Sequence, residues 1–456
     1  MKELFKVGVG KAIITPPLGT LLYGYAFKRP AAMVNDDLRV NVIFAEQGKT
    51  KAVLISADVV SIGKDLGDRI RELISKEIDV PFENISFSAT HTHSGPAIKT
   101  AKGWGNADET YINDILIPRT IEAVKEATLS VRPAVMGVAS TRSEVGINRR
   151  ELTQEGKIIL GQNEYGIFDP NMTVISFKTS EGAPIANVIH YGTHGTAAGR
   201  GLEITRDWPG VMVDMMEKET GAHTIFFNGS EGDVGPRLSN GQTTGDVRDW
   251  TKTEEPTGDI GYVYEIGTVA GIDAIRAYKS IKEYSEVDFK VESGVLKLPY
   301  DQQWSFEDAK ARLAELDAKD KLIEVENREH AKIKAVVDMY ENNIPFDTYL
   351  DMDQTIFAFN SIAIVPFQFE LFSEISLRMR KYSPFEHTLC LCNTNDSNFY
   401  LPTKDQMERG GYEVDIYRLA SVYKFVDNLD DVIINENMKI LKKMKPFEIQ
   451  KKERYV

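Results

Sequence analysis

Cysteine and histidine are scarce in this chain. Its 456 residues include two cysteines, Cys390 and Cys392, and seven histidines. The loop between the cysteines is too short to favour a disulfide, and a Cys-x-Cys metal site would need further ligands. The first residues show neither the apolar core nor the small-residue cleavage site of an export signal. We therefore expect a reduced, cytoplasmic setting.

Long apolar runs and an excess of positive charge are also absent. No stretch approaches the roughly 18 apolar residues that span a bilayer, so no integral membrane segment is expected. Lysine and arginine number 54 against 68 acidic residues, which gives a formal net charge of −14. Such an acidic surface argues against unaided binding to nucleic acid or anionic membranes. A small-molecule substrate is the expected partner, and the sequence carries no signal for oligomeric state.

The chain alternates between strand-like and helix-like segments. Strand patterns occur at 7–14, 38–46, 52–57, 85–89, 173–177, 185–189, 224–227, 361–365 and 389–392. Helical spacing occurs at 66–78, 111–128, 208–219, 260–278, 371–382 and 432–444. Residues 38–57 suggest a hairpin, and Asp207 is a candidate N-cap. The alternation predicts an α/β or layered α+β fold with mixed sheets flanked by helices.

Residues 306–341 differ from the rest because they are rich in Ala, Lys, Glu and Leu and nearly free of Gly and Pro. The composition predicts two helices, or one broken helix, with a solvated face. The segment is either a surface excursion or a lid over a site. No internal repeat or low-complexity linker is evident, so we expect one domain over residues 1–456.

Four of the seven histidines lie in two short clusters. His91 and His93 follow the strand at 85–89, and this placement predicts that both rings point to one face. His190 and His194 follow the strand at 185–189. Imidazoles at strand ends can hold a metal or transfer protons, and the alternative is a set of hydrogen-bonded structural residues. A third loop, residues 227–236, is rich in glycine and carries carboxylates, but such loops are usually turns.

Six short motifs in one order resemble the neutral/alkaline non-lysosomal ceramidase family. They are THTHSGP at 90–96, GINR at 146–149, HGT at 194–196, DWPG at 207–210, GDVGP at 232–236, and YLPT at 400–403 followed by Tyr412. The resemblance covers the catalytic N-terminal domain of that family. It predicts the family's fold and one catalytic zinc ion (Zn2+).

The resemblance also assigns roles to residues. His91, His194, Glu370 and Tyr400 would bind the zinc ion. For Glu370 the alignment leaves an alternative, because matching the preceding proline would place Gln368 at that position. The remaining assignments are catalytic: His93 as an acid/base or positioning group, Tyr412 as a donor to the developing oxyanion, Arg149 as a holder of a polar or anionic group, and Asp233 within GDVGP.

Such a ligand set is chemically reasonable. Two neutral imidazoles and one carboxylate leave a zinc ion with net positive charge, which activates a bound water and polarises a carbonyl. A tyrosine donor could add a few kcal/mol of transition-state stabilisation. The predicted reaction is hydrolysis of an amide or ester by metal-activated water.

The chain departs from the family at three points. Gly235 replaces the serine of the family's GDVSP motif, which excludes a serine nucleophile there but not attack by water. Neither a secretory segment nor strand signals of a C-terminal immunoglobulin-like domain are found. These departures favour a soluble, non-ceramide substrate. The alternatives are a true ceramidase, which cleaves N-acylsphingosine, and a non-catalytic homologue that binds metal or ligand.

Overall fold

The structure is a computed structural model that describes residues 3–25, 28–100, 106–239, 260–301, 304–322, 324–419 and 422–445. Its first large sheet pairs in the order β7-β6-β5-β1-β8. The strands are β1 (Phe5–Ile13), β5 (Arg39–Gln47), β6 (Thr50–Ala57), β7 (Ile85–Ala89) and β8 (Arg132–Pro133). The hairpin expected from the sequence is confirmed, because β5 and β6 pair antiparallel. Helix α1 (Lys64–Ile78) then carries the chain back so that β7 lies parallel to β6.

Two further large sheets are built in the same way. One has the order β15-β13-β12-β9 and the other the order β21-β19-β18-β17-β23. The former contains β9 (Val135–Arg142), β12 (Asn171–Lys178), β13 (Pro184–Tyr191) and β15 (His223–Asn228). The latter contains β17 (Phe289–Asp301), β18 (Tyr349–Phe359), β19 (Ile362–Pro366), β21 (His387–Leu391) and β23 (Lys424–Phe425). Helices α4 (Asp207–Thr220) and α8 (Ser373–Tyr382) make the crossovers.

A topological repeat therefore exists that the sequence does not show. In the described part of the chain, each large sheet contains two successive antiparallel pairings followed by one parallel pairing at an edge. The first and third sheets add a short antiparallel pairing, with β8 and β23, at the opposite edge. A helix precedes each of these parallel edge strands, which are β7, β15 and β21. The absence of a repeat in the sequence is compatible with this topology, because segments that share a strand order need not share residues.

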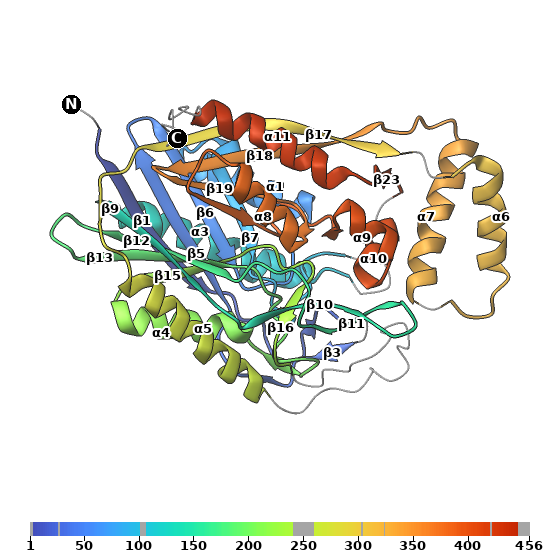
Figure 1. The fold of residues 1–456 in the computed structure, drawn as a ribbon, viewed down its shortest axis with the longest axis horizontal. Helices are drawn as coiled ribbons and strands as arrows, with labels where there is room; N and C mark the ends of the chain where they lie inside the picture. Colours follow the sequence, from blue (N-terminus) through green and yellow to red (C-terminus); the bar gives the residue numbers. More distant parts are fainter. Residues whose placement is uncertain are drawn as a thin grey trace, which may run out of the picture.

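The three sheets pack around one apolar core. Val7, Ile175 and Phe357, one from each sheet, belong to this shared cluster and are almost fully buried. The other face of each sheet is covered by helices: α1 and α3 (Ile117–Leu129) on the first, α4 and α5 (Gly261–Lys279) on the second, and α8 and α11 (Leu429–Met444) on the third. Figure 1 shows these outer helices around the strands. The predicted class of mixed sheets flanked by helices is confirmed.

The charged segment forms two helices, α6 (Phe306–Asp317) and α7 (Glu324–Glu341), at one end of the molecule (Figure 1). Residue 323 of this segment lies outside the described residues. A small apolar cluster that includes Ala309 and Val336 joins the two helices. Lys332 on α7 donates to the carbonyl of Arg418 on α10 (Tyr412–Leu419). The pair of helices is thus attached to the body beside the helix that carries Tyr412.

Short elements complete the fold. They are β2 (Leu21–Leu22), β3 (Arg29–Pro30), β4 (Met33–Val34), η1 (Phe82–Asn84), α2 (Glu109–Tyr111), η2 (Ile112–Leu116), β10 (Gly146–Leu152), β11 (Ile158–Asn163), β14 (Glu203–Ile204), β16 (Val234–Pro236), β20 (Glu370–Leu371), β22 (Tyr400–Leu401) and α9 (Lys404–Arg409). The helix predicted from residue 371 begins only at Ser373, because Glu370 and Leu371 pair with β22. No helix in the described part of the chain is both long and apolar enough to cross a membrane.

Candidate metal centre

The parallel edge strands of the three large sheets, β7, β15 and β21, meet at their carboxyl ends. Ala89 N, at the end of β7, donates to Asn393 O just after β21. Cys392 N donates to Asn228 O at the end of β15, and the Asn228 amide donates to Thr90 O. Residues that follow strands in different sheets are therefore brought together at one place, and the candidate ligands lie there.

His91 and His93 lie in the loop after β7 rather than on the strand. His91 has a positive φ of 67°, so the prediction that strand alternation places both rings on one face was wrong in its reason. The rings nevertheless converge, with 3.2 Å between the two Nε2 atoms. His91 Nδ1 donates to Val60 O at 2.7 Å, which directs Nε2 toward the centre. Burial lowers the pKa of both histidines, so both are neutral near pH 7 and suited to bind a cation.

His194 approaches the same point from the loop after β13. Its Nδ1 donates to Glu231 O at 2.8 Å, which leaves Nε2 facing the centre, and burial lowers its pKa well below the usual value. Its ring centroid is 4.6 Å from that of His91. His190 from the same motif lies elsewhere, because its Nε2 contacts Cys390 O.

Asp207 fixes the loop that follows His194. Its carboxylate accepts hydrogen bonds from Ala197 N at 2.9 Å, Ala198 N at 2.8 Å and Trp208 N at 2.8 Å. The prediction that Asp207 is the N-cap of α4 was wrong, because the N-cap position is occupied by Arg206 and Asp207 is the first residue of the helix, with a positive φ of 58°.

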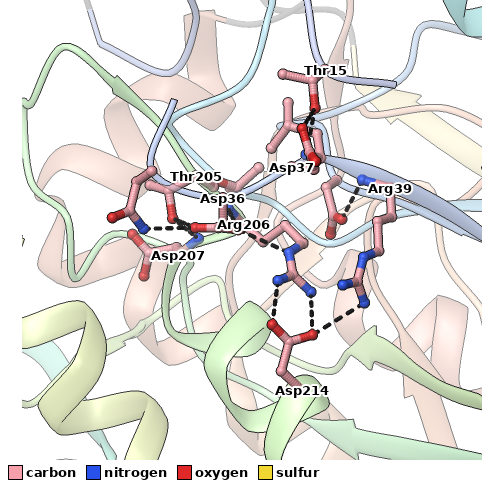
Figure 2. Close-up of polar contacts among 12 residues, drawn as sticks. Thr15, Asp36, Asp37, Arg39, Thr205, Arg206, Asp207 and Asp214 are labelled. Carbon is pink, nitrogen blue, oxygen red and sulfur yellow. Dashed lines mark hydrogen bonds and ion pairs between the residues drawn. The ribbon is translucent and has the colours of Figure 1, made fainter. Parts of the chain in front are cut away.

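The neighbouring Arg206 ties the same region to the start of β5. It donates to Asp36 at 2.8 Å and pairs with Asp214 on α4, and Arg39 also reaches Asp214 (Figure 2). This network anchors the N-terminus of α4, and with it Asp207, to the first sheet. Residues without contact to the centre thus position one of its imidazoles.

Glu370 and Tyr400 come from the small parallel pair β20–β22, in which they are register partners. Glu370 Oε2 lies 3.3 Å from His194 Nε2 and 3.6 Å from His91 Nε2. The Tyr400 ring is stacked on the His194 ring, with 6.4 Å between the two ring centroids. Gln368 is not at the centre, because its carbonyl and side chain contact Asn398. Of the two alternatives left open by the sequence, the structure places Glu370 beside the histidines.

Glu231 is a second carboxylate at the centre, to which the sequence analysis gave no role. Its side chain is fully buried, and its ligand atom lies within 4.8 Å of those of His91 and Glu370. Asn393 Nδ2 donates to Glu231 Oε1 at 2.6 Å. Burial and the proximity of Glu370 raise the pKa of Glu231 well above its usual range. The available signal was its place in the GSEGD loop directly after β15.

The donor set fits a metal ion. His194 Nε2, Glu370 Oε2 and Glu231 Oε2 are buried and have no hydrogen-bond partner among the described residues. Glu231 lies beside Glu370, and Glu370 lies beside His194, and unpaired acceptors this close together are unfavourable unless a cation binds between them. Imidazole nitrogen with carboxylate and phenol oxygen is a donor set that zinc accepts. The cysteines do not contribute: the described groups that could hold a metal contain only histidine and glutamate.

Arg149 and Tyr412 flank the centre on the Tyr400 side. Arg149 Nε donates to Glu413 Oε1 at 2.8 Å, and its Cζ lies 5.3 Å from the Tyr400 ring centroid. The Tyr412 and Tyr400 ring centroids are 5.8 Å apart. Glu413 also accepts from Arg150, so α10 is bound to β10 through a buried pair of guanidinium groups. The structure therefore brings Arg149 and Tyr412 together beside Tyr400.

Asp233 has a different environment. Its Oδ1 accepts from Ser373 N at 2.8 Å and from Ser373 Oγ at 2.7 Å, and Asn148 donates to Oδ2 at 3.2 Å. Burial raises its pKa to about 6. The carboxylate joins β10 to the first turn of α8 and does not line the pocket. Two residues later, Gly235 lies beside Arg149, at the position of the family's serine.

A pocket that is partly open to solvent leads to the centre. Its described lining residues are Tyr23, Val60, Ser61, His91, His93, Lys99, Arg328, Glu370, Ser397, Phe399, Tyr400, Tyr412 and Ile416. Lys99, Arg328 and Phe399 were missed by sequence reasoning, because each belongs to a segment without a recognisable motif.

A family model matches residues 5–275, more than half of the chain, and is described as neutral/alkaline non-lysosomal ceramidase, N-terminal. The chain belongs to this family. The resemblance predicted from six motifs is thus confirmed. His91, Arg149, His194 and Glu231 lie within the part matched to the ceramidase model, whereas Glu370, Tyr400 and Tyr412 lie beyond it.

Individual ceramidases show the same relationship. Neutral ceramidase 2 of Arabidopsis thaliana is 23% identical over 59% of this chain and 36% of its own length. Neutral ceramidase A of Dictyostelium discoideum is 25% identical over 58% of this chain and 40% of its own length. The matched part thus spans less than half of these relatives.

Solved ceramidase structures have the same fold. The crystal structure of neutral ceramidase from Pseudomonas aeruginosa superposes with a TM-score of 0.71 at 15% identity, over 97% of this chain and 75% of that one. A structure described as ceramidase complexed with C2 gives a TM-score of 0.69 at 14% identity, with the same coverage.

Proposed function

We propose that this chain is a zinc-dependent hydrolase that cleaves an amide or ester bond of a soluble, non-ceramide small molecule. The observation that carries the proposal is the convergence of His91, His194 and Glu370 on one point beside Tyr400. Family membership supports hydrolysis, since the curated relatives are named ceramidases. The fully buried, unpaired acceptor atoms support a cation.

Each residue has a role in this proposal. His91, His194, Glu370 and Tyr400 hold the zinc ion, which when bound lowers the pKa of a coordinated water toward about 7 and polarises a carbonyl. His93, whose Nε2 lies 3.2 Å from His91 Nε2, moves protons between nucleophile and leaving group. Tyr412 donates to the developing oxyanion, and Arg149 orients a polar or anionic group. Asp233 positions the β16 loop and α8 through Ser373.

Ceramidase activity is the second candidate. The names of the relatives favour it, and Val60, Phe399 and Ile416 give the pocket apolar surface. A non-catalytic homologue is the third, and the glycine at position 235 is its support. A panel of N-acylsphingosine in detergent micelles, 4-nitrophenyl acetate and soluble N-acetyl compounds separates the three. We expect turnover of the soluble compounds alone. Turnover of N-acylsphingosine would favour a ceramidase, and no turnover of any compound would favour a non-catalytic homologue.

Metal analysis tests the centre itself. Protein purified without chelator is expected to contain one zinc ion per chain, and His91→Ala should lose it. His387→Ala is the matched control, because His387 lies at the start of β21 away from the centre. Circular dichroism establishes that both variants fold. Unchanged zinc content in a folded His91→Ala protein would refute the ligand assignment.

Two further predictions concern the chain as a whole. A cytoplasmic setting stays a prediction, which cell fractionation tests. Organisation as one domain also stays a prediction, and limited proteolysis tests it: a stable fragment released from residues 1–456 would contradict it.

A further inference from the structure

The proposed function gives Glu231 no role, although its carboxylate lies at the metal centre. The side chain is fully buried, and one of its oxygens lies within 4.8 Å of a ligand atom of His91 and of Glu370. Donor atoms that share one zinc ion, each about 2.0–2.2 Å from it, are at most about 4.4 Å apart. The three groups are therefore within a small side-chain adjustment of a common ion.

The backbone around Glu231 is bonded to the segments that carry two of the other donors. The Glu231 carbonyl accepts from His194 Nδ1 at 2.8 Å, and Gly232 N donates to Leu371 O, the neighbour of Glu370, at 2.9 Å. A Cβ at position 232 would lie 2.4 Å from Glu370 O, so this close approach requires glycine. The loop therefore holds the Glu231 side chain in a fixed place relative to both segments.

The two oxygens of the Glu231 carboxylate have different surroundings. Asn393 Nδ2 donates to Oε1 at 2.6 Å, and the Cys392 thiol, a weak donor, lies beside the carboxylate. Oε2 is buried and accepts no N–H or O–H hydrogen bond from the described residues. An ionised carboxylate in such surroundings is costly unless a cation compensates its charge. Oε2 is therefore available to a cation, while Asn393 holds Oε1.

Glu413 shows how a structural carboxylate is accommodated in the same region. It is equally buried, but Oε1 accepts from Arg149 at 2.8 Å and Oε2 from Arg150 at 2.6 Å. In the described part of the chain, neither oxygen of Glu231 has such a guanidinium partner, and the nearest charged neighbour is a second carboxylate, that of Glu370. Such an arrangement is unfavourable without a cation and favourable around one.

Resting on the proposed zinc-dependent function, we propose that Glu231 is a further ligand of the metal ion, through Oε2. It joins the imidazoles of His91 and His194, the Glu370 carboxylate and the Tyr400 phenol. Two carboxylates match the charge of a divalent cation, which lowers the cost of burying the ion. Five protein donors exceed the four of a tetrahedral zinc site, so the ion is five- or six-coordinate.

Replacement of zinc by cobalt tests the coordination number. Co2+ absorbs visible light strongly in four-coordinate sites and weakly in six-coordinate ones, because a site without a centre of symmetry allows its d–d transitions. Glu231→Gln removes the charge and keeps the shape, and Glu231→Leu removes both oxygens. We expect weak absorption from the Co2+-loaded wild type and a molar absorptivity about twofold higher, or more, in both variants.

Zinc affinity tests the same ligand independently. Chelator competition should give a dissociation constant about tenfold higher, or more, for Glu231→Gln than for the wild type, which corresponds to about 1.4 kcal/mol. Glu329→Gln is the matched control, because Glu329 is a largely buried glutamate on α7 that pairs with Arg312. It should leave both the zinc affinity and the Co2+ spectrum unchanged. Circular dichroism establishes that each variant folds.

The outcomes separate this inference from the proposed function. A Co2+ spectrum and a zinc affinity that are the same in the wild type and both Glu231 variants would overturn the inference and leave the hydrolase proposal intact. Weaker zinc binding with an unchanged Co2+ spectrum would also overturn it, since Glu231 would then act from outside the ligand shell. Wild-type protein that binds neither Zn2+ nor Co2+ would refute the proposed function itself.

Discussion

Glu370 and Tyr400 are direct register partners in a two-residue parallel pair, although a helix and a strand of the third sheet separate them along the chain. Phe399 O accepts from Glu370 N, and Phe372 N donates to Leu401 O, so backbone bonds fix the pair on both sides. The carboxylate and the phenol therefore reach the histidines as one unit. Each side chain in this pair can be tested separately.

Substitution of Tyr400 should weaken metal binding. Tyr400→Phe removes a phenol oxygen whose ring stacks on His194, and the zinc dissociation constant is expected to rise at least tenfold, about 1.4 kcal/mol. Tyr412→Phe is the matched control, since the same hydroxyl is deleted from the ring 5.8 Å away. It should leave zinc affinity unchanged and lower kcat. Chelator competition measures the affinity, and equal weakening in both variants would contradict the assignment of Tyr400.

Asp207 should influence the metal centre without touching it. Asp207→Asn places an amide donor against backbone N–H groups that now donate to the carboxylate. The loop after His194 loses an anchor, and zinc affinity should fall by about 10- to 100-fold. The control is Glu219→Gln on the same helix, whose partly exposed side chain pairs with Lys279 instead. Similar zinc affinities for the two variants would show that the loop does not depend on Asp207.

Adding a side chain should affect protein stability differently at the two glycines near the centre, Gly235 and Gly24. A Cβ at Gly235 would lie 3.8 Å from the nearest atom of Arg149, which is ordinary contact. Gly235→Ser, which restores the family's hydroxyl, should leave the melting temperature within about 3 °C. A Cβ at Gly24 would lie 2.6 Å from the His93 ring, and φ there is +109°. Gly24→Ala should reduce the free energy of unfolding by about 1–3 kcal/mol; urea titration that finds equal stabilities would contradict this reading.

His223 should make the protein less stable in acid. Burial, with Lys11 and Arg39 nearby, lowers its pKa from the model-peptide value of 6.5 to about 3. Between these values the unfolded chain binds a proton that the folded chain does not. The free energy of unfolding therefore falls by about 1.4 kcal/mol per pH unit below pH 6.5, and this contribution is fully present above it.

His223→Gln isolates that contribution. The difference in unfolding free energy between wild type and variant should be constant above pH 7 and should shift in favour of the variant from pH 6 to pH 4. Urea titrations at each pH measure it. Parallel curves over that range would contradict the assigned shift.

Much of the local structure follows from the sequence. Period-two and helical patterns predicted β5, β6, β7 and α5 to within a few residues, because strand and helix spacing depend on near neighbours. The motif order also predicted His91, His194 and Tyr400 as partners of one centre. The predicted boundaries of elements were wrong where pairing with a distant strand replaced the local preference. Leu371, predicted to begin a helix, instead forms strand β20 with Glu370 and pairs with β22.

The secondary-structure elements, the family and the candidate histidine and tyrosine ligands follow from local sequence patterns and short motifs. Which strand ends meet depends on the tertiary structure. That meeting brings Glu231 and Asn393 to the histidines. It also brings Lys99, Arg328 and Phe399 to the pocket. The difference lies in the sequence separation over which the residues interact. Local patterns are set by backbone geometry over a few residues, whereas convergence of three strand ends arises only when three sheets bury one shared apolar core.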